Sequence, residues 1–431
     1  MKLYHASSLH GTMTVPGDKS ISHRSVILGA IAEGDTRIRG FLKSDDCLST
    51  IKIFRAMGVS IEEKEDELVV HGAGLHGLKA PINSLDCGNS GTTARLLSGL
   101  LSGQSFSSAL TGDASLSRRP MKRVIDPLRI LGADIRSETE KGTLPLHISP
   151  SGLTGKSITI PVSSAQVKSA LLLAGLYAEG ETRVTEPALS RNHTELMLKA
   201  FGADAFSGSF KEPTAVIRPG DTLHGQDITV PGDISSAAFF LGAGLITPDS
   251  EITVKNVGIN PTRDGLLRVL KDMNANLTIE NEKEEGGEKC ADLTVRTSSL
   301  KAAQIGGSLI PLLIDELPLI ALLATQAEGR TVIRDAGELK VKESDRILLM
   351  SEGLNAMGAK ITPTGDGMVI EGPTPLHHAR IETGGDHRIA MTFSVASLIN
   401  SDVQCVTLSD SSCVSISYPT FYRDLDALIS C

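Results

Sequence analysis

Basic and hydroxyl side chains gather in the segment PGDKSISHR, near the start of the chain. Lys19, Ser20 and Arg24 fall within about one and a half turns of a helix, which places Ser20 and Arg24 on one face. The spacing G-x-x-x-x-G-K-[ST] of a nucleotide-binding phosphate loop does not occur here, so nucleotide binding has little support. A lysine and an arginine at a helix start favour an anion site.

A second basic cluster, SRRPMKR, follows a predicted strand and contains Arg118, Arg119, Lys122 and Arg123. One interpretation is a solvated run of charges on the surface. The other is a structured turn, because Pro120 restricts the backbone and the preceding SLS supplies hydroxyl groups. The residues alone leave both interpretations open.

Acidic side chains recur at predicted helix starts in the second half of the chain. Asp315 and Glu316 are flanked by Ile and Leu, where burial raises the pKa of a carboxyl group and suits it to acid or base chemistry. Ordinary N-cap charges are the alternative. The segment ELKVKESDRI then forms an exposed helix start or a catalytic strip, with five charged residues in seven positions: Lys340, Lys342, Glu343, Asp345 and Arg346.

The segment GGDHRIAM places Asp386, His387 and Arg388 at the start of a predicted buried helix. A buried arginine needs a partner for its charge. Its planar guanidinium also suits two-point binding of a carboxylate or phosphate group. Arg388 is therefore a candidate ligand for an anionic substrate.

A sixfold repeat must position these residues. Six times, a strand-like run leads into a Gly/Ser/Asp-rich turn and then into a helix rich in Ala and Leu. The repeats recur every roughly 70 to 80 residues, which is about the size of a βαβαββ unit. The six turn-and-helix segments are PGDKSISHRSVILGAIA from Pro16, CGNSGTTARLLSGLL from Cys87, PVSSAQVKSALLLAGL from Pro161, PGDISSAAFFLGAGL from Pro231, IDELPLIALLA from Ile314 and GGDHRIAMTFSVASL from Gly384.

A predicted strand and a second, amphipathic helix follow each of these helices. The second helices close on sequences such as AMGVSI and AFGADA, where glycine suits a left-handed C-cap. The first helices are apolar nearly all round, which indicates helices buried inside each domain. The strands are predicted at 35–41, 105–112, 181–187, 250–257, 330–337 and 403–410.

Six repeats in 431 residues divide into three plus three, and the turn at Val230–Pro231 marks the boundary. The strand predicted at residues 1–14 pairs with either half. Ser, Asn, Asp and Gly are helix-capping residues, and helix N-termini favour bound anions. If the helices in each half run parallel, several N-termini face one cleft and form an anion site. A purely capping role for each turn is the alternative.

Composition excludes several classes of protein. The net charge of −9 and the scarcity of aromatic residues argue against nucleic-acid binding. The N-terminus lacks the apolar run of a signal peptide, and no apolar stretch is long enough to span a bilayer, so we predict a soluble, cytoplasmic enzyme. Six cysteines without CxxC or metal-ligand spacing predict reduced thiols and no metal: Cys47, Cys87, Cys290, Cys405, Cys413 and Cys431.

Six motifs, in order along the chain, resemble the 5-enolpyruvylshikimate-3-phosphate synthase (EPSP synthase) family: GDKSISHR, LDCGNSGTTARLL, VSSAQVKSALLLAGL, DELPLIALLA, ELKVKESDRI and GDHRIAM. The resemblance covers essentially the whole chain. It implies the enolpyruvyl transferase-like fold, a two-domain inside-out α/β barrel in which each domain has three βαβαββ repeats around buried parallel helices. It also implies a discontinuous first domain at 1–15 plus 231–431, a second domain at 16–230, and an active site in the cleft between them.

The resemblance further implies transfer of the enolpyruvyl group of phosphoenolpyruvate to the 5-hydroxyl of shikimate 3-phosphate, in the shikimate pathway to chorismate and aromatic amino acids. Asp315 takes the hydroxyl proton, and Glu343 or Lys19 protonates the methylene carbon. We expect no cofactor, no nucleic-acid or membrane partner, and a monomer. The residues implied for shikimate 3-phosphate are Lys19, Ser20, Arg24, Ser163, Ser164, Ala165, Gln166, Ser190 or Arg191, Asp315 and Lys342. Those implied for phosphoenolpyruvate are Lys19, Gly91, Arg119, Gln166, Arg346 and Arg388.

Three positions leave sensitivity to the inhibitor glyphosate open. His193 stands where many relatives have a Tyr on the substrate ring, and Ile416 where many have a Lys that binds phosphoenolpyruvate. Both suggest the branch that includes glyphosate-tolerant members. Gly91, in contrast, is the small residue typical of sensitive enzymes. Without that lysine, the positive charge that binds phosphoenolpyruvate must come from Lys19, Arg119, Arg346 and Arg388.

The nearest alternative is the sister family that transfers enolpyruvyl to UDP-N-acetylglucosamine on the same fold. Its members carry a catalytic Cys in a loop of the form G-x-C-x-I-x-A-R-P. The corresponding loop here, GDASLSRRP at 112–120, contains no Cys, although Asp113 lies where some relatives use an Asp. A non-enzymatic repeat protein is a further alternative, which accounts for the repeats but not for the basic side chains at separate helix starts.

Overall fold

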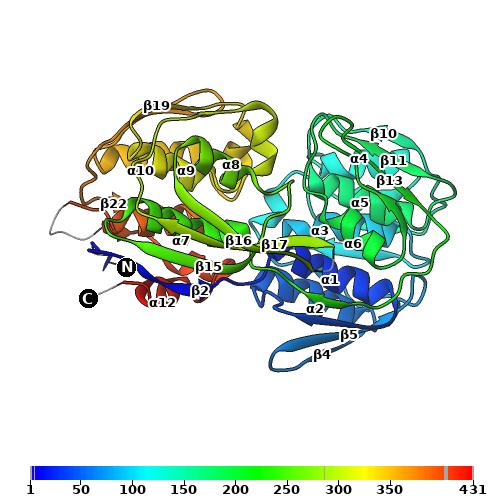
Figure 1. Cartoon of the computed structure of the whole chain (residues 1–431). Coiled ribbons are helices and arrows are strands. Elements are labelled where there is room, and N and C mark those ends of the chain that lie inside the picture. The colour runs from blue at the N-terminus through cyan, green and yellow to red at the C-terminus, as the bar shows by residue number, and fades with distance from the viewer. Residues whose placement is uncertain (1, 4, 286, 402–405, 430–431) are drawn as a thin grey trace. The chain divides into compact units, whose positions relative to one another are not determined.

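Two compact units make up the chain in this computed structural model, which describes residues 2–3, 5–285, 287–401 and 406–429 (Figure 1). Unit 1 contains residues 1–16, 231–283 and 289–431, and unit 2 contains residues 17–230 and 284–288. Each unit has its own apolar core.

Unit 2 contains two repeats that are continuous in the chain. One consists of β6 (Leu85–Asp86), α3 (Gly91–Ser102), β7 (Ser108–Thr111), α4 (Lys122–Ile130), β8 (Asp134–Ser137) and β9 (Leu146–Ser149). The next consists of β10 (Ser157–Thr159), α5 (Ala165–Gly175), β11 (Thr182–Thr185), α6 (His193–Ala200), β12 (Asp204–Phe206) and β13 (Thr214–Arg218). In each sheet the first two strands are parallel and the other pairs are antiparallel, in the orders β6-β7-β9-β8 and β10-β11-β13-β12. Both repeats are therefore βαβαββ units.

A strand from the far end of unit 2 completes its third repeat. This repeat contains α1 (Lys19–Ile31), β3 (Glu33–Arg39), α2 (Asp45–Ala56), β4 (Ser60–Glu63) and β5 (Glu67–Ala73). The missing first strand is β14 (Asp227–Thr229), which lies parallel to β3 with Ile228 opposite Ile38.

Unit 1 is built in the same way, and both of its N-terminal strands complete repeats there. The first repeat contains α7 (Ile234–Ile246), β15 (Glu251–Gly258), α8 (Gly265–Asp272), β16 (Asn276–Glu285) and β17 (Glu288–Arg296), with β2 (His10–Thr14) parallel to β15. The second contains β18 (Gln304–Ile305), α9 (Leu317–Thr325), β19 (Gly329–Ile333), α10 (Arg346–Ala356), β20 (Lys360–Pro363) and β21 (Met368–Gly372). The third contains β22 (Arg380–Ile381), α11 (His387–Ser397), β23 (Val406–Leu408) and α12 (Phe421–Asp426), with β1 (Lys2–Leu3) antiparallel to β23.

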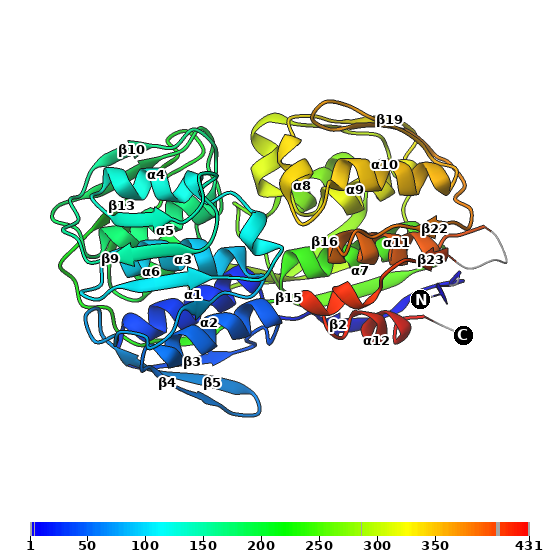
Figure 2. The ribbon, with the colours of Figure 1, turned by 180° about the vertical axis from the view of Figure 1, so that it is seen from behind.

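The apolar first helices of the repeats are buried, as predicted. Nearly every residue of α1, α3, α5, α7, α9 and α11 is inaccessible to solvent. Within its own unit, α1 packs on β3 and β5, and α9 packs on β21, with the sheets outside and these helices inside (Figures 1 and 2). The sixfold α/β repeat that the sequence predicts is confirmed.

The neighbouring buried helices α3 and α5 run parallel. At the start of α3 and α5, Gln166 donates to Thr92 at 3.0 Å, and further along both helices Gly99 lies against Ala170. A Cβ atom on Gly99 would lie 1.9 Å from the carbonyl oxygen of Ala170, so only glycine allows this approach. The helix N-termini of α3 and α5 are therefore neighbours, which is the condition for the predicted anion site.

The second helices end as the sequence predicts. The glycines after α2, α4, α6 and α10 have positive φ angles of 84°, 103°, 101° and 91°: Gly58, Gly132, Gly202 and Gly358. After α8 the same position is taken by Asn274 at φ 61°, because asparagine is the residue that tolerates this conformation next best.

Several strand boundaries differ from the predictions. The strand predicted at 330–337 ends at Ile333 because Asp335 has φ 60°, which breaks an extended chain. The strand predicted at 403–410 is described only as Val406–Leu408, since Cys405 and its neighbours lie outside the described residues, as does Cys431. The four cysteines within the described ranges are free and buried, and burial raises the pKa of the Cys47 and Cys87 thiols. In the described part of the chain no helix is long and apolar enough to cross a membrane.

Candidate active site

The start of α1 in unit 2 presents Lys19 and Ser20. Asp18 caps the helix by accepting a hydrogen bond from the backbone N–H of Ile21 at 2.9 Å. The ammonium group of Lys19 forms an ion pair with Asp46 in α2, and 27% of the Lys19 side chain is exposed. The predicted lysine is thus held at a buried helix N-terminus with part of its side chain open to solvent.

Arg24 lies one turn further into the same helix and is almost completely buried. It donates hydrogen bonds to the hydroxyls of Thr194 at 2.6 Å and Ser169 at 2.8 Å, and to the carbonyl of Ser20 at 2.9 Å. These acceptors carry no net charge and fix the orientation of the guanidinium. Burial lowers the pKa of Arg24 to about 10, although the charges of Glu195 and Asp18 act to raise it. Arg24 is thus a buried, oriented cation, which suits an anionic ligand.

The segment VSSAQ begins α5, with Ser164 as its N-cap. Gln166 donates to Thr92 and accepts from Arg95, which donates to it at 2.8 Å. Ser163, Ser164, Ala165 and Gln166 are all half-buried. The helix start therefore offers hydroxyl, amide and guanidinium groups side by side.

A buried carboxylate fixes the backbone of this segment. Glu186 accepts from the backbone N–H of Ser164 at 2.9 Å, and from the N–H and hydroxyl of Ser190 at 3.2 and 2.7 Å. Lys168 in α5 compensates the negative charge of Glu186. Its ammonium nitrogen lies 2.9 Å from Glu186 and 2.9 Å from Glu195. Lys168 and Glu186 were not among the predicted site residues, because nothing in a run of Ala and Leu indicates which acidic residues the lysine contacts.

The start of α3 brings two guanidinium groups together at Gly91. A Cβ atom at this position would lie 2.7 Å from Nη1 of Arg95 and 3.5 Å from Nη1 of Arg119. Arg119 donates to the side-chain carbonyl of Asn89 at 2.6 Å. The SRRPMKR cluster is therefore a structured turn, with a 3₁₀ helix at Leu116–Arg118 and Arg119 turned toward α3.

Two residues that the sequence singled out have structural partners in unit 2. Asp113 accepts from the backbone N–H of Leu116 at 2.8 Å and from Asn89 at 2.7 Å, which makes it a capping residue of the turn. His193 is buried at the start of α6, and its Nδ1 lies 2.7 Å from a carboxylate oxygen of Glu288.

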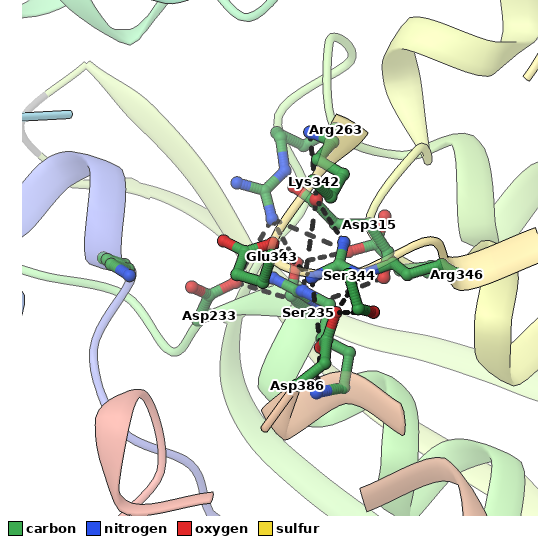
Figure 3. A network of polar contacts seen from close by, with 12 residues as sticks. Asp233, Ser235, Arg263, Asp315, Lys342, Glu343, Ser344, Arg346 and Asp386 are labelled. Carbon is green, nitrogen blue, oxygen red and sulfur yellow. Dashed lines mark hydrogen bonds and ion pairs between the residues drawn. The ribbon is translucent and has the colours of Figure 1, made fainter. Parts of the chain in front are cut away.

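Unit 1 contains a network of charged side chains centred on Arg346 (Figure 3). Arg346 is fully buried and donates from Nε and Nη2 to the two oxygens of Asp386, at 2.8 and 3.3 Å. It also donates to Glu343 at 2.7 Å and to Asp315 at 3.4 Å. Burial acts to lower the pKa of Arg346, but Glu343 and Asp386 outweigh it and the pKa is raised. The ELKVKESDRI segment is thus a part of this network and not a solvated helix start.

Asp315 lies just before α9 and is approached by three cations. Its carboxylate oxygen is 3.4 Å from Arg346, 3.5 Å from the ammonium of Lys342 and 4.0 Å from Nε of Arg388. Arg388 also donates to the Asp315 carbonyl at 3.2 Å, so the arginine at this helix start has the partner that its burial requires.

The two acidic residues at the start of α9 have different environments. Glu316 occupies the N-cap position, but its side chain turns to the hydroxyl of Ser235 in α7 and lies 3.9 Å from Arg263. Arg263 is buried and donates to Ser235 at 2.7 Å and to Asp233 at 3.2 Å. Of this second cluster only Glu316 was predicted from the sequence; the cluster holds the start of α7 to the start of α9.

The remaining site predictions fall in the same unit. Asp386 caps α11 and is fully buried; burial acts to raise its pKa, but Arg346 outweighs it and the pKa is lowered. Burial lowers the pKa of His387 to about 4, so this imidazole is neutral near pH 7. Ile416, at the end of a short 3₁₀ helix (Ser412–Ile416), packs against the apolar core of the unit.

The structure thus brings the predicted residues into one group in each unit. Unit 2 contains the first group, at the starts of α1, α3 and α5: Lys19, Ser20, Arg24, Gly91, Arg119, Ser163, Ser164, Ala165, Gln166 and Arg191. Unit 1 contains the second, around α9, α10 and α11: Asp315, Lys342, Glu343, Arg346 and Arg388. Each group combines helix N-termini with guanidinium and ammonium groups, which suits phosphate and carboxylate ligands. Among the described residues no three His, Cys, Asp or Glu side chains form a cluster suited to a metal ion.

Comparisons with known proteins agree with this arrangement. Residues 3–425 match the family model of EPSP synthase (3-phosphoshikimate 1-carboxyvinyltransferase). The 3-phosphoshikimate 1-carboxyvinyltransferase of Bacillus velezensis is 51% identical over 99% of both chains, and that of Listeria monocytogenes is 49% identical over the full length of both. A solved structure of EPSP synthase from Acinetobacter baumannii superimposes with a TM-score of 0.89 at 49% identity, over 99% of this chain and 97% of that one. The enolpyruvyl transferase NikO from Streptomyces tendae shares the fold, with a TM-score of 0.79 at 20% identity over 99% of this chain and 96% of that one. The chain belongs to the EPSP synthase family.

Proposed function

We propose that the chain transfers the enolpyruvyl group of phosphoenolpyruvate to the 5-hydroxyl of shikimate 3-phosphate and releases phosphate. The observation that carries this proposal is that each unit has a cationic group at its helix starts, in a chain that matches the EPSP synthase family over residues 3–425. Phosphoenolpyruvate has a phosphate and a carboxylate, and shikimate 3-phosphate has the same two anionic groups. Several fixed cations at helix starts are what such a pair of substrates requires.

In unit 2, we assign the shikimate 3-phosphate site to the starts of α1 and α5. The support is the geometry of Arg24, which neutral acceptors orient, and of Ser164 and Ser190, which Glu186 fixes. Lys19 and the groups around Gly91 bind phosphoenolpyruvate beside it. Asn89 orients Arg119, which we assign with Lys19, Arg346 and Arg388 to carry the charge that the lysine absent at Ile416 would supply.

In unit 1, we assign Asp315 as the base and Lys342 as a ligand of shikimate 3-phosphate, with Arg346 and Arg388 as ligands of phosphoenolpyruvate. Three cations lie within 4.0 Å of one carboxylate oxygen of Asp315. The anionic groups of phosphoenolpyruvate compete for these cations, and their departure from Asp315 leaves its carboxylate oxygen available to accept the hydroxyl proton.

We propose that the reaction is an addition followed by an elimination. The 5-hydroxyl oxygen attacks C2 of phosphoenolpyruvate while its proton passes to Asp315. Glu343 or Lys19 gives a proton to C3, which produces a tetrahedral adduct that is not bound covalently to the protein. Phosphate then leaves C2 and a proton leaves the new methyl group, which restores the carbon–carbon double bond in the product.

We propose that both units serve this one reaction as the two domains 1–15 plus 231–431 and 16–230, and that substrate binding brings them together. The support is that the residues implied for each substrate come from both units. We also propose that the enzyme is a monomer in the cytoplasm. Small-angle scattering with and without both substrates tests closure, because closure reduces the radius of gyration, and its molecular mass tests the monomer.

The test of function is phosphate release from phosphoenolpyruvate, with shikimate 3-phosphate or UDP-N-acetylglucosamine as acceptor. We expect release only with shikimate 3-phosphate, and release only with the sugar nucleotide would assign the chain to the sister reaction. Arg119→Ala should lower kcat/KM by about 10²-fold or more, as loss of a charged transition-state contact does. Arg118→Ala, an exposed neighbour in the same turn, is the matched control and should stay within about twofold. Equal effects of the two variants would contradict the assignment of Arg119.

The proton donor to C3 is tested separately. Single-turnover reactions in D₂O should place deuterium at C3 of the product in the wild type. If Glu343 is the donor, Glu343→Gln should abolish this incorporation and Lys19→Met should retain it at a reduced rate. If Lys19 is the donor, the two results should be exchanged. Incorporation at the wild-type rate in both variants would exclude both residues as donors.

A further inference from the structure

Four fully buried polar side chains form one hydrogen-bonded chain across three helices of unit 2. Nδ1 of His23 in α1 lies 2.8 Å from the hydroxyl of Thr50 in α2. That hydroxyl lies 2.8 Å from the hydroxyl of Thr93 in α3, which donates to the hydroxyl of Ser90 at 2.7 Å. All four residues have zero exposure to solvent. We refer to His23, Thr50, Thr93 and Ser90 as the buried relay.

The direction of each hydrogen bond in the relay follows from counting protons. The hydroxyl of Thr93 uses its single proton on Ser90, so Thr50 must donate to Thr93. The hydroxyl of Thr50 then has no proton left, so Nδ1 of His23 must donate to Thr50. His23 is therefore the Nδ1–H tautomer, whereas the Nε2–H tautomer is the more populated form of free histidine in water.

The second ring nitrogen supports the same assignment. Nε2 of His23 is buried and has no hydrogen-bond partner among the residues that the structure describes. A proton on Nε2 would be a buried donor without an acceptor, whereas a proton on Nδ1 has the Thr50 hydroxyl as its acceptor. Burial lowers the pKa of His23 to about 3, so the ring stays neutral beside Lys19 and Arg24.

The relay begins and ends next to residues of the proposed site. His23 lies four residues after Lys19 in α1, and Thr50 lies four residues after Asp46 in α2. The Lys19–Asp46 ion pair and the His23–Thr50 hydrogen bond are therefore successive links between the same two helices, one turn apart. At the other end, Ser90 caps α3 and directly precedes Gly91, where Arg95 and Arg119 converge.

We propose that His23, Thr50 and Thr93 are positioning residues, which set the relative register of α1, α2 and α3 so that Lys19 and the guanidinium groups at Gly91 meet one phosphoenolpyruvate molecule. This inference rests on the proposed function of the site. Apolar side chains of the same shape would fill the space between the helices equally well. They would not fix one axial register, whereas a directional hydrogen-bonded chain does.

The test uses variants of the full-length protein that remove single hydroxyl groups. Thr50→Val breaks two links of the relay with little change in volume, and Thr50→Ser keeps the hydroxyl. Thr182→Val is the matched control, because the Thr182 hydroxyl in β11 is buried in the same unit without a hydrogen bond among the described residues. We expect Thr50→Val to lower kcat/KM for phosphoenolpyruvate by about tenfold or more, as a displaced catalytic group does. Thr50→Ser should restore most of the activity, and Thr182→Val should leave it unchanged.

Thermal midpoints and ¹⁵N NMR separate positioning from simple loss of structure. All variants are assayed well below their thermal midpoints, and kcat/KM is compared at equal folded fraction. With ¹⁵N-labelled histidine, and His23→Gln to identify the resonances, Nδ1 of His23 should show the shift of a protonated nitrogen in the wild type. In Thr50→Val this preference should be lost.

Three outcomes would overturn the inference. An Nε2–H tautomer in the wild type would contradict the direction of the relay. Wild-type kinetics in Thr50→Val, or an equal loss in Thr182→Val, would contradict its positioning role. If the wild type releases no phosphate with shikimate 3-phosphate, the proposed function fails instead, and the tautomer measurement still decides the structure of the relay.

Discussion

Replacing Lys168 by methionine tests how unit 2 stabilises its buried charges. Only 1% of the Lys168 side chain is exposed, and its ammonium group lies 2.9 Å from both Glu186 and Glu195. Methionine keeps the length and apolar volume of the lysine stem, so little cavity forms. The change leaves two carboxylates without their shared cation.

The expected loss of stability is large. Removing one partner of a buried ion pair costs about 3–5 kcal/mol, and here two carboxylates lose the same partner, so we expect a loss near the upper end. A typical domain has only about 5–15 kcal/mol of unfolding free energy. Burial acts to lower the pKa of Lys168, but Glu195 and Glu186 outweigh it and the pKa is raised. The contribution is therefore complete at neutral pH and is lost only as the pH rises through the raised pKa.

Urea unfolding followed by far-ultraviolet circular dichroism measures the loss, since the chain has no Trp for fluorescence. Lys199→Met, at an exposed lysine of α6, is the control and should change the unfolding free energy by less than about 0.5 kcal/mol. Lys168→Met with Glu195→Gln removes one surplus carboxylate and should recover part of the loss. A loss below about 1 kcal/mol in Lys168→Met would refute the ion-pair account. A raised KM for shikimate 3-phosphate is expected as well, because Glu186 holds the backbone of the proposed site.

Three further predictions follow from the same geometry. Asp386→Asn should cost about 3–5 kcal/mol of unfolding free energy in urea, because a fully buried guanidinium loses its two-point partner; a change under about 1 kcal/mol would contradict this. Gly91→Ala should raise KM for phosphoenolpyruvate about tenfold with little change in thermal midpoint, because its Cβ atom would lie 2.7 Å from the flexible tip of Arg95; an unchanged KM would show that this tip is not needed. Burial lowers the pKa of His23 to about 3 and of His387 to about 4, so stability should fall as the pH drops below about 6.5, by about 2 kcal/mol for each histidine at pH 5. Urea midpoints at pH 7 and pH 5 check this, and equal midpoints would be inconsistent with neutral buried histidines.

The repeated architecture could be predicted from sequence because its signals are local. Runs of Ala and Leu after a capping residue predict α1, α3 and α5, and the glycines after the amphipathic helices predict left-handed caps such as Gly58. The strands β14 and β22 could not be placed, since two or three residues are too few to show a period. The single strand predicted at residues 1–14 is two separate strands, β1 and β2.

The polar clusters depend on contacts that no local pattern encodes. Arg346 was predicted from a charged segment, but its pairing with Asp386 joins helices that are 40 positions apart in the sequence. Lys168 and Arg263 gave no sequence signal of their own, because a single charge beside apolar or turn residues is compatible with exposure. Their importance becomes visible only when burial shows that each needs a partner.

The way the N-terminal strand completes unit 1 has a consequence for the order of folding during synthesis. The backbone N–H of Leu9, just before β2, donates to Ser250, which lies 241 positions later in the chain. When Ser250 leaves the ribosome, all the strands of residues 17–230, through β14, have already left it. Residues 17–230 of unit 2 can therefore fold before β15 is available to pair with β2. In folded unit 2 a Cβ atom at Gly17 would lie 3.0 Å from the side chain of Val230, so the two ends of this stretch are neighbours. Folding of residues 17–230 therefore brings residues 17 and 230 together. This shortens the loop that must close between Leu9 and Ser250 from more than two hundred residues to a few dozen at most.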